Sequence, residues 1–252
     1  MTRLRRSRAT RDEGTSLVEM LVTMALLTVV LAATITFIIG FTRTNAKNVS
    51  LQQQVDTGRS ASQMMTKTLR TAVMPSQLTS SCTLCTEDAF VMGQDYAVQF
   101  YANINNPGNS VGPSRVTYTV ATSGPNAGDL VEKVQLPQSN SPGVTGYDYC
   151  AAEAPSATVD CKNKLSTRIL AKGVQFNSGT PLFQYYDANG TRLVPPVGGG
   201  LTVADLGNVL QVELTVKVQA QAAARMNATT YIQRITLPNA QAVLRQNEVT
   251  TP

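Results

Sequence analysis

The fold of this chain is decided by residues 20–42, which read MLVTMALLTVVLAATITFIIGFT. This run of 23 residues contains no ionisable side chain. A helix rises 1.5 Å per residue, so the run would be about 35 Å long, enough to cross a hydrocarbon core of about 30 Å. We therefore predict one membrane-spanning helix over about 17–41. Its apolar side chains include Leu17, Leu21, Leu26, Leu27, Leu31, Phe37 and Phe41.

The charges on either side of this segment predict its orientation. Five arginines lie within residues 1–14, whereas only Arg43 and Lys47 follow closely after the apolar run. Because the cytoplasmic flanks of membrane helices carry the excess of Lys and Arg, we expect the N-terminus inside and the rest of the chain outside the cytoplasm. The protein would then be a single-pass protein of the cytoplasmic (inner) membrane.

The composition limits the classes of function. The net charge is +5, and residues 1–14 hold +3 of it, which leaves about +2 for the remainder. Such a charge gives little attraction for nucleic acid, so we expect no nucleic-acid partner. The chain has no His, which is the commonest general base and metal ligand. With no phosphate-binding glycine loop and no suggestive pair of carboxylates, the sequence predicts no enzymatic activity, cofactor or metal.

A carboxylate interrupts the beginning of the apolar segment. Glu19 lies two residues inside a stretch that is otherwise apolar. A charged side chain at bilayer depth costs about 2.5–3.5 kcal/mol on insertion scales, so Glu19 calls for a positive partner. Cleavage of the chain after Gly14 would supply one, because Thr15 would then carry a free α-amino group.

A short basic leader, Gly14, an apolar start and a Glu five residues after the Gly together resemble the processing signal of type IV pilins and type II secretion pseudopilins. The resemblance implies that a prepilin peptidase cleaves between Gly14 and Thr15 and N-methylates Thr15. The usual first residue in that family is Phe, so Thr15 is a departure. The resemblance also implies that Glu19 pairs with the N-terminal amine of a neighbouring subunit. Implied partners are other pilins or pseudopilins, the peptidase and the assembly platform.

Other interpretations of the N-terminal segment remain open. A secretory signal peptide also places a basic stretch before an apolar run, although its apolar part usually has 7–15 residues. A plain signal anchor would hold an extracytoplasmic domain without cleavage at Gly14. Glu19 could also simply extend its carboxylate to the cytoplasmic interface.

The helix is expected to continue beyond the membrane. Apolar or small residues recur at steps of three and four, and charged and amide side chains occupy the other positions. The positions predicted to face a domain are Leu51, Val55, Gly58, Ser62, Met65, Leu69 and Ala72. Pro75 ends the pattern, so we predict one helix over 15–74 whose second half packs on a globular domain over 75–252.

The region 75–252 is predicted to be rich in β-structure. Apolar and polar side chains alternate at 96–104, 115–120 and 210–218, and Tyr231 and Ile235 indicate a closing strand. Residues 187–190 read Asp-Ala-Asn-Gly, which favours a turn over a calcium loop because so short a segment supplies too few oxygen ligands. The predicted fold class is therefore α+β, a long helix packed on an antiparallel β-sheet domain.

The C-terminal third adds a second, shorter resemblance. The aromatic stretch 183–186, the turn at 187–190 and the alternating strand at 210–218 are similar to the C-terminal region of PulJ-like and PilW-like minor pilins. This resemblance implies a type IV pilin-like fold. Residues 76–165 resemble nothing that would assign them a role.

Four cysteines lie in the part expected outside the cytoplasm, where disulfides persist. We favour the pairs Cys150 with Cys161 and Cys82 with Cys85. A zinc site is the alternative, but the second pair is separated by ten residues rather than two to four. A redox-active Cys-x-x-Cys would need a βαβ setting that the pattern does not indicate.

Together these features predict a minor pilin or pseudopilin. It would be a structural subunit of a type IV pilus or type II secretion-like filament, at the initiating or tip complex, found first in the inner membrane and then in a surface or periplasmic filament. The alternatives are a tip-exposed adhesin or DNA-uptake module, and a plain signal-anchored extracytoplasmic domain.

Overall fold

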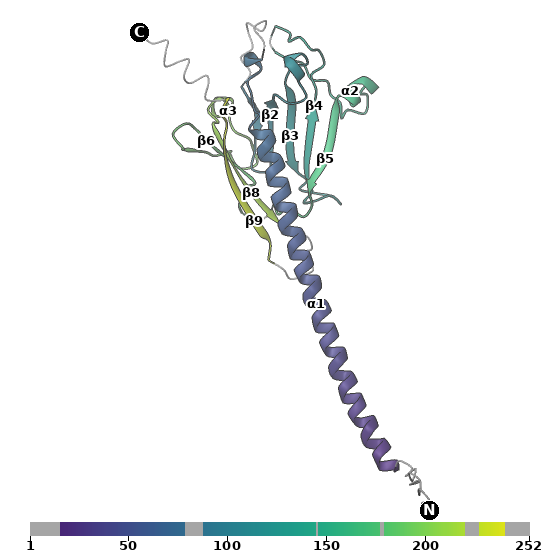
Figure 1. The fold of residues 1–252 in the computed structure, drawn as a ribbon. Helices are drawn as coiled ribbons and strands as arrows, with labels where there is room; N and C mark the ends of the chain where they lie inside the picture. The colour runs from purple at the N-terminus through teal and green to yellow at the C-terminus, as the bar shows by residue number, and fades with distance from the viewer. Residues whose placement is uncertain (1–15, 79–87, 145, 177–178, 220–226, 240–252) are drawn as a thin grey trace, which may run out of the picture. The chain divides into compact units, whose positions relative to one another are not determined.

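The computed structural model describes residues 16–78, 88–144, 146–176, 179–219 and 227–239. The chain divides into two units, Met1–Val49 and Ser50–Pro252. The boundary falls inside helix α1, which covers Leu17–Leu69 (Figure 1). The first unit therefore holds the apolar half of the helix, and the second unit holds its other half together with all the described strands.

In the second unit α1 buries one stripe of side chains. The buried residues are Gln54, Gly58, Ala61, Ser62, Met65, Thr66 and Leu69. This stripe contains four of the positions that the spacing predicted, but its first turn is shifted, because Gln54 is buried while Val55 is 38% exposed. Gln54 faces strand β9, where the hydroxyl of Thr229 donates to its Oε1 at 3.5 Å.

The end of α1 corrects the predicted boundary. The helix ends at Leu69 rather than at Met74. Ala72 forms a β-bridge with Ala102, and the amide of Val73 donates to the carbonyl oxygen of Tyr101 at 2.9 Å. Residues just before Pro75 therefore exchange helical hydrogen bonds for pairing with the sheet, a change that a helical spacing pattern does not reveal.

The first sheet is an antiparallel meander in the order β1-β2-β3-β4-β5. Its strands are β1 (Phe90–Gly93), β2 (Ala97–Ala102), β3 (Ser114–Val120), β4 (Leu130–Gln135) and β5 (Leu165–Ala171). Figure 1 shows β2 to β5 side by side in sequence order. The predictions at 96–104 and 115–120 are confirmed by β2 and β3, whereas β1, β4 and β5 were not predicted.

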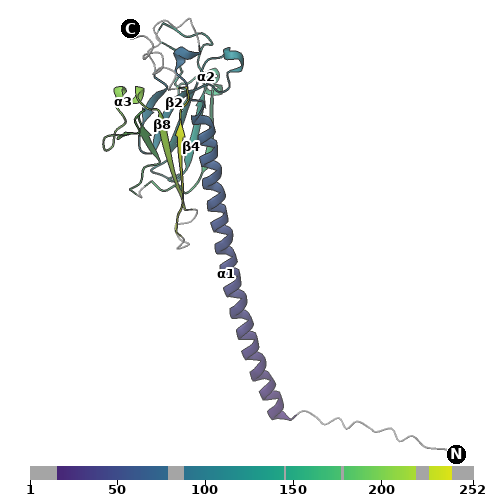
Figure 2. The same cartoon turned by 60° about the vertical axis from the view of Figure 1, so that its left-hand side comes forward.

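The second sheet has the order β7-β6-β8-β9, with antiparallel pairing throughout. Its strands are β6 (Phe183–Tyr186), β7 (Arg192–Leu193), β8 (Gln211–Val218) and β9 (Thr229–Thr236). Figure 2 shows β8 from a second side. The alternation at 210–218 is confirmed as β8, and the closing strand is confirmed as β9.

The turn at 187–190 is also confirmed. The carboxylate of Asp187 accepts hydrogen bonds from the amides of Asn189 and Thr191 at 2.9 and 2.7 Å. Gly190 has a φ of 78°, in the left-handed region that favours glycine. These contacts complete the connection between β6 and β7 and give the Asp187 carboxylate a role in the turn.

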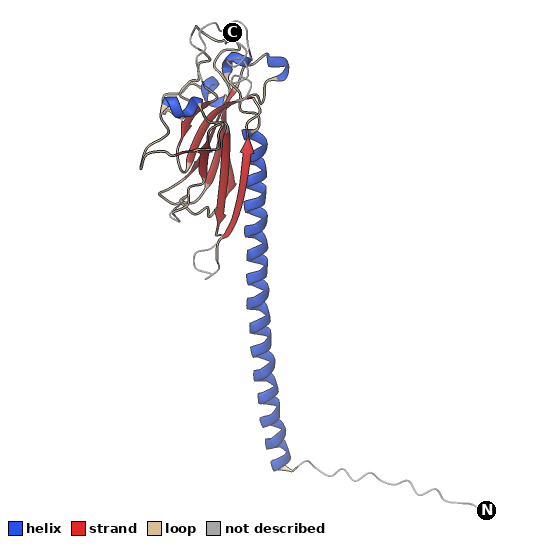
Figure 3. Ribbon diagram, turned by 90° about the vertical axis from the view of Figure 1, so that its left-hand side faces the viewer, coloured by secondary structure: helices blue, strands red, loops and turns tan. Residues whose placement is uncertain are grey.

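One core joins the second half of α1 to both sheets. Met65 and Leu69 lie in the same buried cluster as Phe100 and Tyr118 of the first sheet and Leu214 of the second. In Figure 3 the red strands gather beside this part of the blue helix. The short helices are η1 (Pro75–Gln77), η2 (Pro107–Asn109), α2 (Val159–Asn163) and α3 (Val203–Gly207).

The contact between α1 and β9 depends on a glycine. A Cβ atom at Gly58 would lie 2.7 Å from Cδ2 of Tyr231 and 3.5 Å from Cγ2 of Val218. One turn further along the helix, Ser62 donates its hydroxyl to Oε1 of Gln233 at 3.1 Å. The missing side chain at Gly58 therefore sets how closely the helix and the second sheet approach.

Candidate functional site

The first half of α1 exposes its apolar side chains. Every residue from 16 to 49 is exposed, including the seven predicted for the membrane segment, which range from 51% exposed for Leu31 to 79% for Leu17. The helix is long and apolar enough to cross a membrane. Because so much contiguous apolar surface is unfavourable in water, this half of α1 is consistent with a single-pass membrane anchor.

The threonine hydroxyls of this segment are hydrogen-bonded within the helix. Threonine hydroxyls donate to backbone carbonyl oxygens three or four residues earlier, at 2.8–3.0 Å; the threonines are Thr23, Thr28, Thr34, Thr36, Thr42 and Thr44. In hydrocarbon an unpaired hydroxyl would cost several kcal/mol, on the order of 4–8. The threonines therefore do not prevent the segment from entering a bilayer.

The structure gives Glu19 a local role that the sequence analysis missed. The amide of Glu19 donates to Oγ of Ser16 at 3.2 Å, and the amide of Met20 donates to the Ser16 carbonyl oxygen at 3.2 Å. Ser16 therefore caps the helix, and the Ser-x-x-Glu spacing is the sequence signature of a capping box. A carboxylate in the first turn is also favoured by the helix dipole. Gly14 and Thr15, the predicted cleavage site, lie outside the described residues.

One of the two favoured disulfides is present. Cys150 and Cys161 are bonded and close a loop between β4 and β5. Cys161 lies in α2. Thr158 caps the beginning of this helix, because its Oγ1 accepts a hydrogen bond from the Cys161 amide at 3.3 Å. Cys82 and Cys85 lie outside the described residues, so their pairing stays a prediction.

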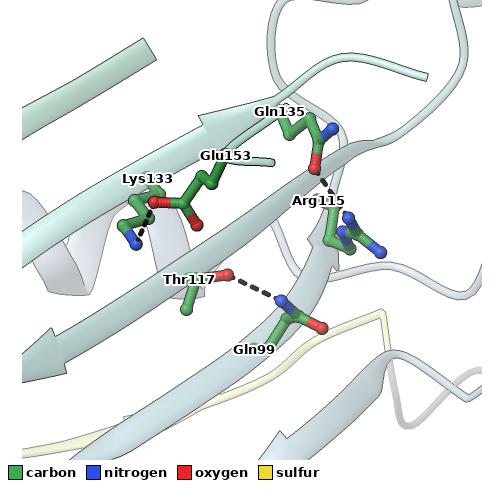
Figure 4. A network of polar contacts seen from close by, with 6 residues as sticks. All are labelled: Gln99, Arg115, Thr117, Lys133, Gln135 and Glu153. Carbon is green, nitrogen blue, oxygen red and sulfur yellow. Dashed lines mark hydrogen bonds and ion pairs between the residues drawn. The ribbon is translucent and has the colours of Figure 1, made fainter. Parts of the chain in front are cut away.

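A polar cavity of about 250 Å³ lies on the outer face of the first sheet, and we call it the sheet-face pocket. Its floor is formed by Gln99, Arg115, Thr117, Lys133, Gln135 and Leu165, and its rim by residues 150–154 of the disulfide loop. Figure 4 shows six of the polar residues in this region. None of the floor residues was singled out from the sequence, because they come from four strands of which two, β4 and β5, were not predicted.

The floor residues occupy two neighbouring rows across the sheet. In one row, Gln99, Thr117 and Lys133 are cross-strand partners; in the next row, Arg115 is paired with Gln135. Gln99 donates from Nε2 to Oγ1 of Thr117 at 2.8 Å. Arg115 donates from Nη2 to Oε1 of Gln135 at 2.6 Å. This register brings two cationic side chains to one face of the sheet.

A separate polar cluster lies on the opposite, buried face. Tyr118, Glu132 and Arg168 are cross-strand neighbours on β3, β4 and β5. The Tyr118 hydroxyl donates to Oε1 of Glu132 at 2.8 Å, and Arg168 donates from Nε to Oε2 of the same carboxylate. Glu132 is only 3% exposed, and a buried carboxylate is tolerated when it is paired and hydrogen-bonded in this way. Burial raises the pKa of Tyr118, so its phenol stays protonated as a donor.

A second cavity, of about 390 Å³, lies between β1, the β6–β7 turn and α3. Phe90 and Leu206 contribute apolar lining, and Asp88 and Asp187 contribute carboxylates. Burial raises the pKa of Asp88. Among the residues that the structure describes, no three His, Cys, Asp or Glu side chains gather to hold a metal ion.

Comparison with known proteins adds no assignment. No protein-family model matches the chain, and the curated proteins contain no significant match.

Proposed function

We propose that this chain is a minor pilin or pseudopilin, a structural subunit that is anchored in the inner membrane and assembles into a filament through α1. The observation that carries the proposal is the N-terminal half of α1. It is one unbroken helix whose exposed apolar surface begins directly after the Gly14–Thr15 sequence and contains the carboxylate of Glu19 in its first turn. Exposed apolar helices of this kind can be buried by lipid or by packing against one another.

Glu19 supports assembly because its carboxylate is exposed and close to the position of the new N-terminus. Cleavage after Gly14 would make Thr15 the first residue of the chain, directly before Ser16, which caps the beginning of α1. In a bundle of such helices, pairing of Glu19 with the amine of a neighbouring Thr15 would offset the cost of holding both charges near bilayer depth. The capping contact uses the Glu19 amide, so the carboxylate stays available for a neighbour.

The first experiment tests processing. Intact mass and N-terminal sequence are measured on the membrane-extracted protein from cells with and without a prepilin peptidase. We expect a chain that begins at Thr15, one methyl group heavier, only when the peptidase is present. An uncut chain in both strains would reject the pilin class in favour of a plain signal anchor, and a cut after Ala33 would indicate a secretory signal.

The second experiment separates assembly from capping. Glu19→Gln removes the charge and keeps the side-chain shape, whereas Ser16→Ala removes the cap and keeps the charge. If Glu19 acts through a neighbouring amine, Glu19→Gln abolishes incorporation into sheared filaments while Ser16→Ala lowers it by no more than about fivefold, since a cap is worth about 1 kcal/mol. An effect of Glu19→Gln no larger than that of Ser16→Ala, with cleavage at Gly14 intact in both, would contradict the pairing of the Glu19 carboxylate with a neighbouring amine.

A further inference from the structure

The sheet-face pocket already contains one carboxylate, supplied by the protein itself. Glu153 projects from the disulfide loop and its Oε1 lies 2.6 Å from Nζ of Lys133 (Figure 4). The Lys133 side chain is 27% exposed and that of Glu153 is 63% exposed. Exposed ion pairs of this kind contribute little to stability. Glu153 can therefore leave Lys133 without disturbing the floor of the pocket.

The second cation of the pocket is held in a fixed orientation. The guanidinium of Arg115 lies over the ring of Tyr149, 4.6 Å from its centroid, and donates to Gln135. Gln135 in turn donates from Nε2 to the carbonyl oxygen of Cys150. A guanidinium has five N–H donors in a planar fork that matches a carboxylate, and an orientation fixed in advance lowers the entropy lost on binding.

The spacing of the two cations suits one small anion. Arg115 and Lys133 lie on adjacent strands and are diagonal neighbours, because Arg115 pairs with Gln135 and Lys133 pairs with Thr117. The Cα atoms of diagonal neighbours across a sheet are about 7–8 Å apart, within reach of long side chains, and both Arg115 and Lys133 line the pocket. The hydroxyl of Thr117 and the amide of Gln99 add polar groups beside this position.

We propose that the sheet-face pocket binds a small carboxylate ligand, which displaces Glu153 from Lys133 and engages Arg115. Glu153 then competes with the ligand for Lys133. When the ligand is absent, the Glu153 carboxylate occupies the pocket, and when the ligand binds, Glu153 moves out together with the rim of the disulfide loop. The disulfide of Cys150 with Cys161 keeps that competitor attached at both ends. The proposal concerns the globular unit and does not depend on filament assembly.

The test uses the full chain in detergent micelles and measures binding by titration calorimetry. The probes are glucuronate, a sugar acid, and N-acetylglutamate, an amino-acid carboxylate, with glucose and N-acetylglutamine as their uncharged counterparts. We expect the two acids to bind saturably at low salt and the neutral counterparts to give no signal. Binding of one acid alone would identify the source of the ligand and still support the proposal. Failure of both acids, in the wild type and in Glu153→Gln, would overturn it.

Variants distinguish a binding site from a merely structural network. Glu153→Gln removes the competitor and should tighten binding by about threefold to fivefold, a gain that a folding defect cannot produce. Lys133→Met and Arg115→Gln should each weaken binding at least tenfold. Lys217→Met, on β8 of the other sheet, removes the same charge elsewhere and should leave binding unchanged. Unaltered affinity in Glu153→Gln would show that Glu153 does not compete for the pocket, and an equal loss in Lys217→Met would show that the acids respond only to overall charge.

Discussion

Residues 17–49 and 50–69 belong to one helix, yet their side chains have different surroundings. In the first stretch every side chain is exposed, whereas in the second a stripe from Gln54 to Leu69 is buried in a protein core. The backbone is the same in both, so helix formation alone does not explain the sequence. Apolar residues surround the helix where lipid or other helices would cover it, and they form a single stripe where one domain covers it.

The largest expected effect comes from the buried stripe. Leu69 is fully buried, so Leu69→Ala should lower the free energy of unfolding of the second unit by about 2–5 kcal/mol through lost burial and the cavity left behind. Denaturant unfolding can be followed by tyrosine fluorescence, because the chain has eight Tyr and no Trp. Leu27→Ala, on the exposed half, is the matched control and should leave the midpoint unchanged. Similar losses for both variants would mean that the two halves are not independent.

A charge placed in the first half should affect the membrane and not the domain. Leu31→Arg should add about 2.5–3.5 kcal/mol to the cost of insertion, because the new guanidinium would lie near the middle of the apolar run. The fraction of protein that resists alkaline carbonate extraction should fall, while the unfolding midpoint of the second unit stays constant. Full membrane retention of Leu31→Arg would contradict the assignment of residues 17–41 as the anchor.

Two glycines on the same helix give a closer comparison. Gly58→Ala should destabilise the second unit by about 1–3 kcal/mol, because the new methyl group would press on the Tyr231 ring 2.7 Å away. A Cβ atom at Gly40 would have no other atom within 4 Å. Gly40→Ala should therefore raise the stability of the helix by about 0.5–1 kcal/mol, because alanine lowers the backbone entropy of the unfolded state. Unfolding curves measure the first effect, and helix content by circular dichroism measures the second. Stabilisation by both substitutions would show that β9 can move away from α1 without cost.

The smallest effect concerns alkaline pH in the second unit. Burial raises the folded-state pKa of the Tyr118 phenol above its ordinary value of 10.0. The unfolded chain therefore releases this proton first, so the contribution to stability is complete below pH 10 and is lost as the pH rises above it. Between pH 8 and 10.5 the loss should be about 1 kcal/mol per buried phenol. The difference in stability between the wild type and Tyr118→Phe should shrink by that amount, and a constant difference would contradict the burial.

The sequence predicted much of the fold because several elements satisfy simple local rules. The long apolar helix, the alternating strand at 210–218 and the Asp-Ala-Asn-Gly turn need only their own residues to be recognised. Strand β4 was missed because a polar side chain is buried on each of its faces, Glu132 on the core side and Gln135 in the sheet-face pocket, and the partners of both come from other strands. The end of α1 was misplaced for the same reason, since Ala72 leaves the helix to pair with Ala102.

Of the candidate sites, one could also be recognised from local sequence and the other depends on strand pairing. Glu19 was found because an isolated carboxylate in an apolar run is a local signal, and the Ser16 cap could have been found from the Ser-x-x-Glu spacing. The sheet-face pocket could not, because Arg115 and Lys133 come together only through the register of β3 and β4. Two cations on different strands do not indicate a common site until the pairing of those strands is known.

The long connection between β4 and β5 is held at its base, which makes it a convenient attachment point for a label. Nζ of Lys164 donates to the carbonyl oxygens of Pro137 and Gln138 at 2.9 and 2.6 Å, and the amide of Gln138 donates to the carbonyl oxygen of Asp148 at 2.7 Å. Residues 139–141, beyond this clamp, are exposed. An epitope or fluorophore inserted there would leave the clamp, the disulfide and the core in place. Such a label would allow the protein to be followed in living cells without altering either half of α1.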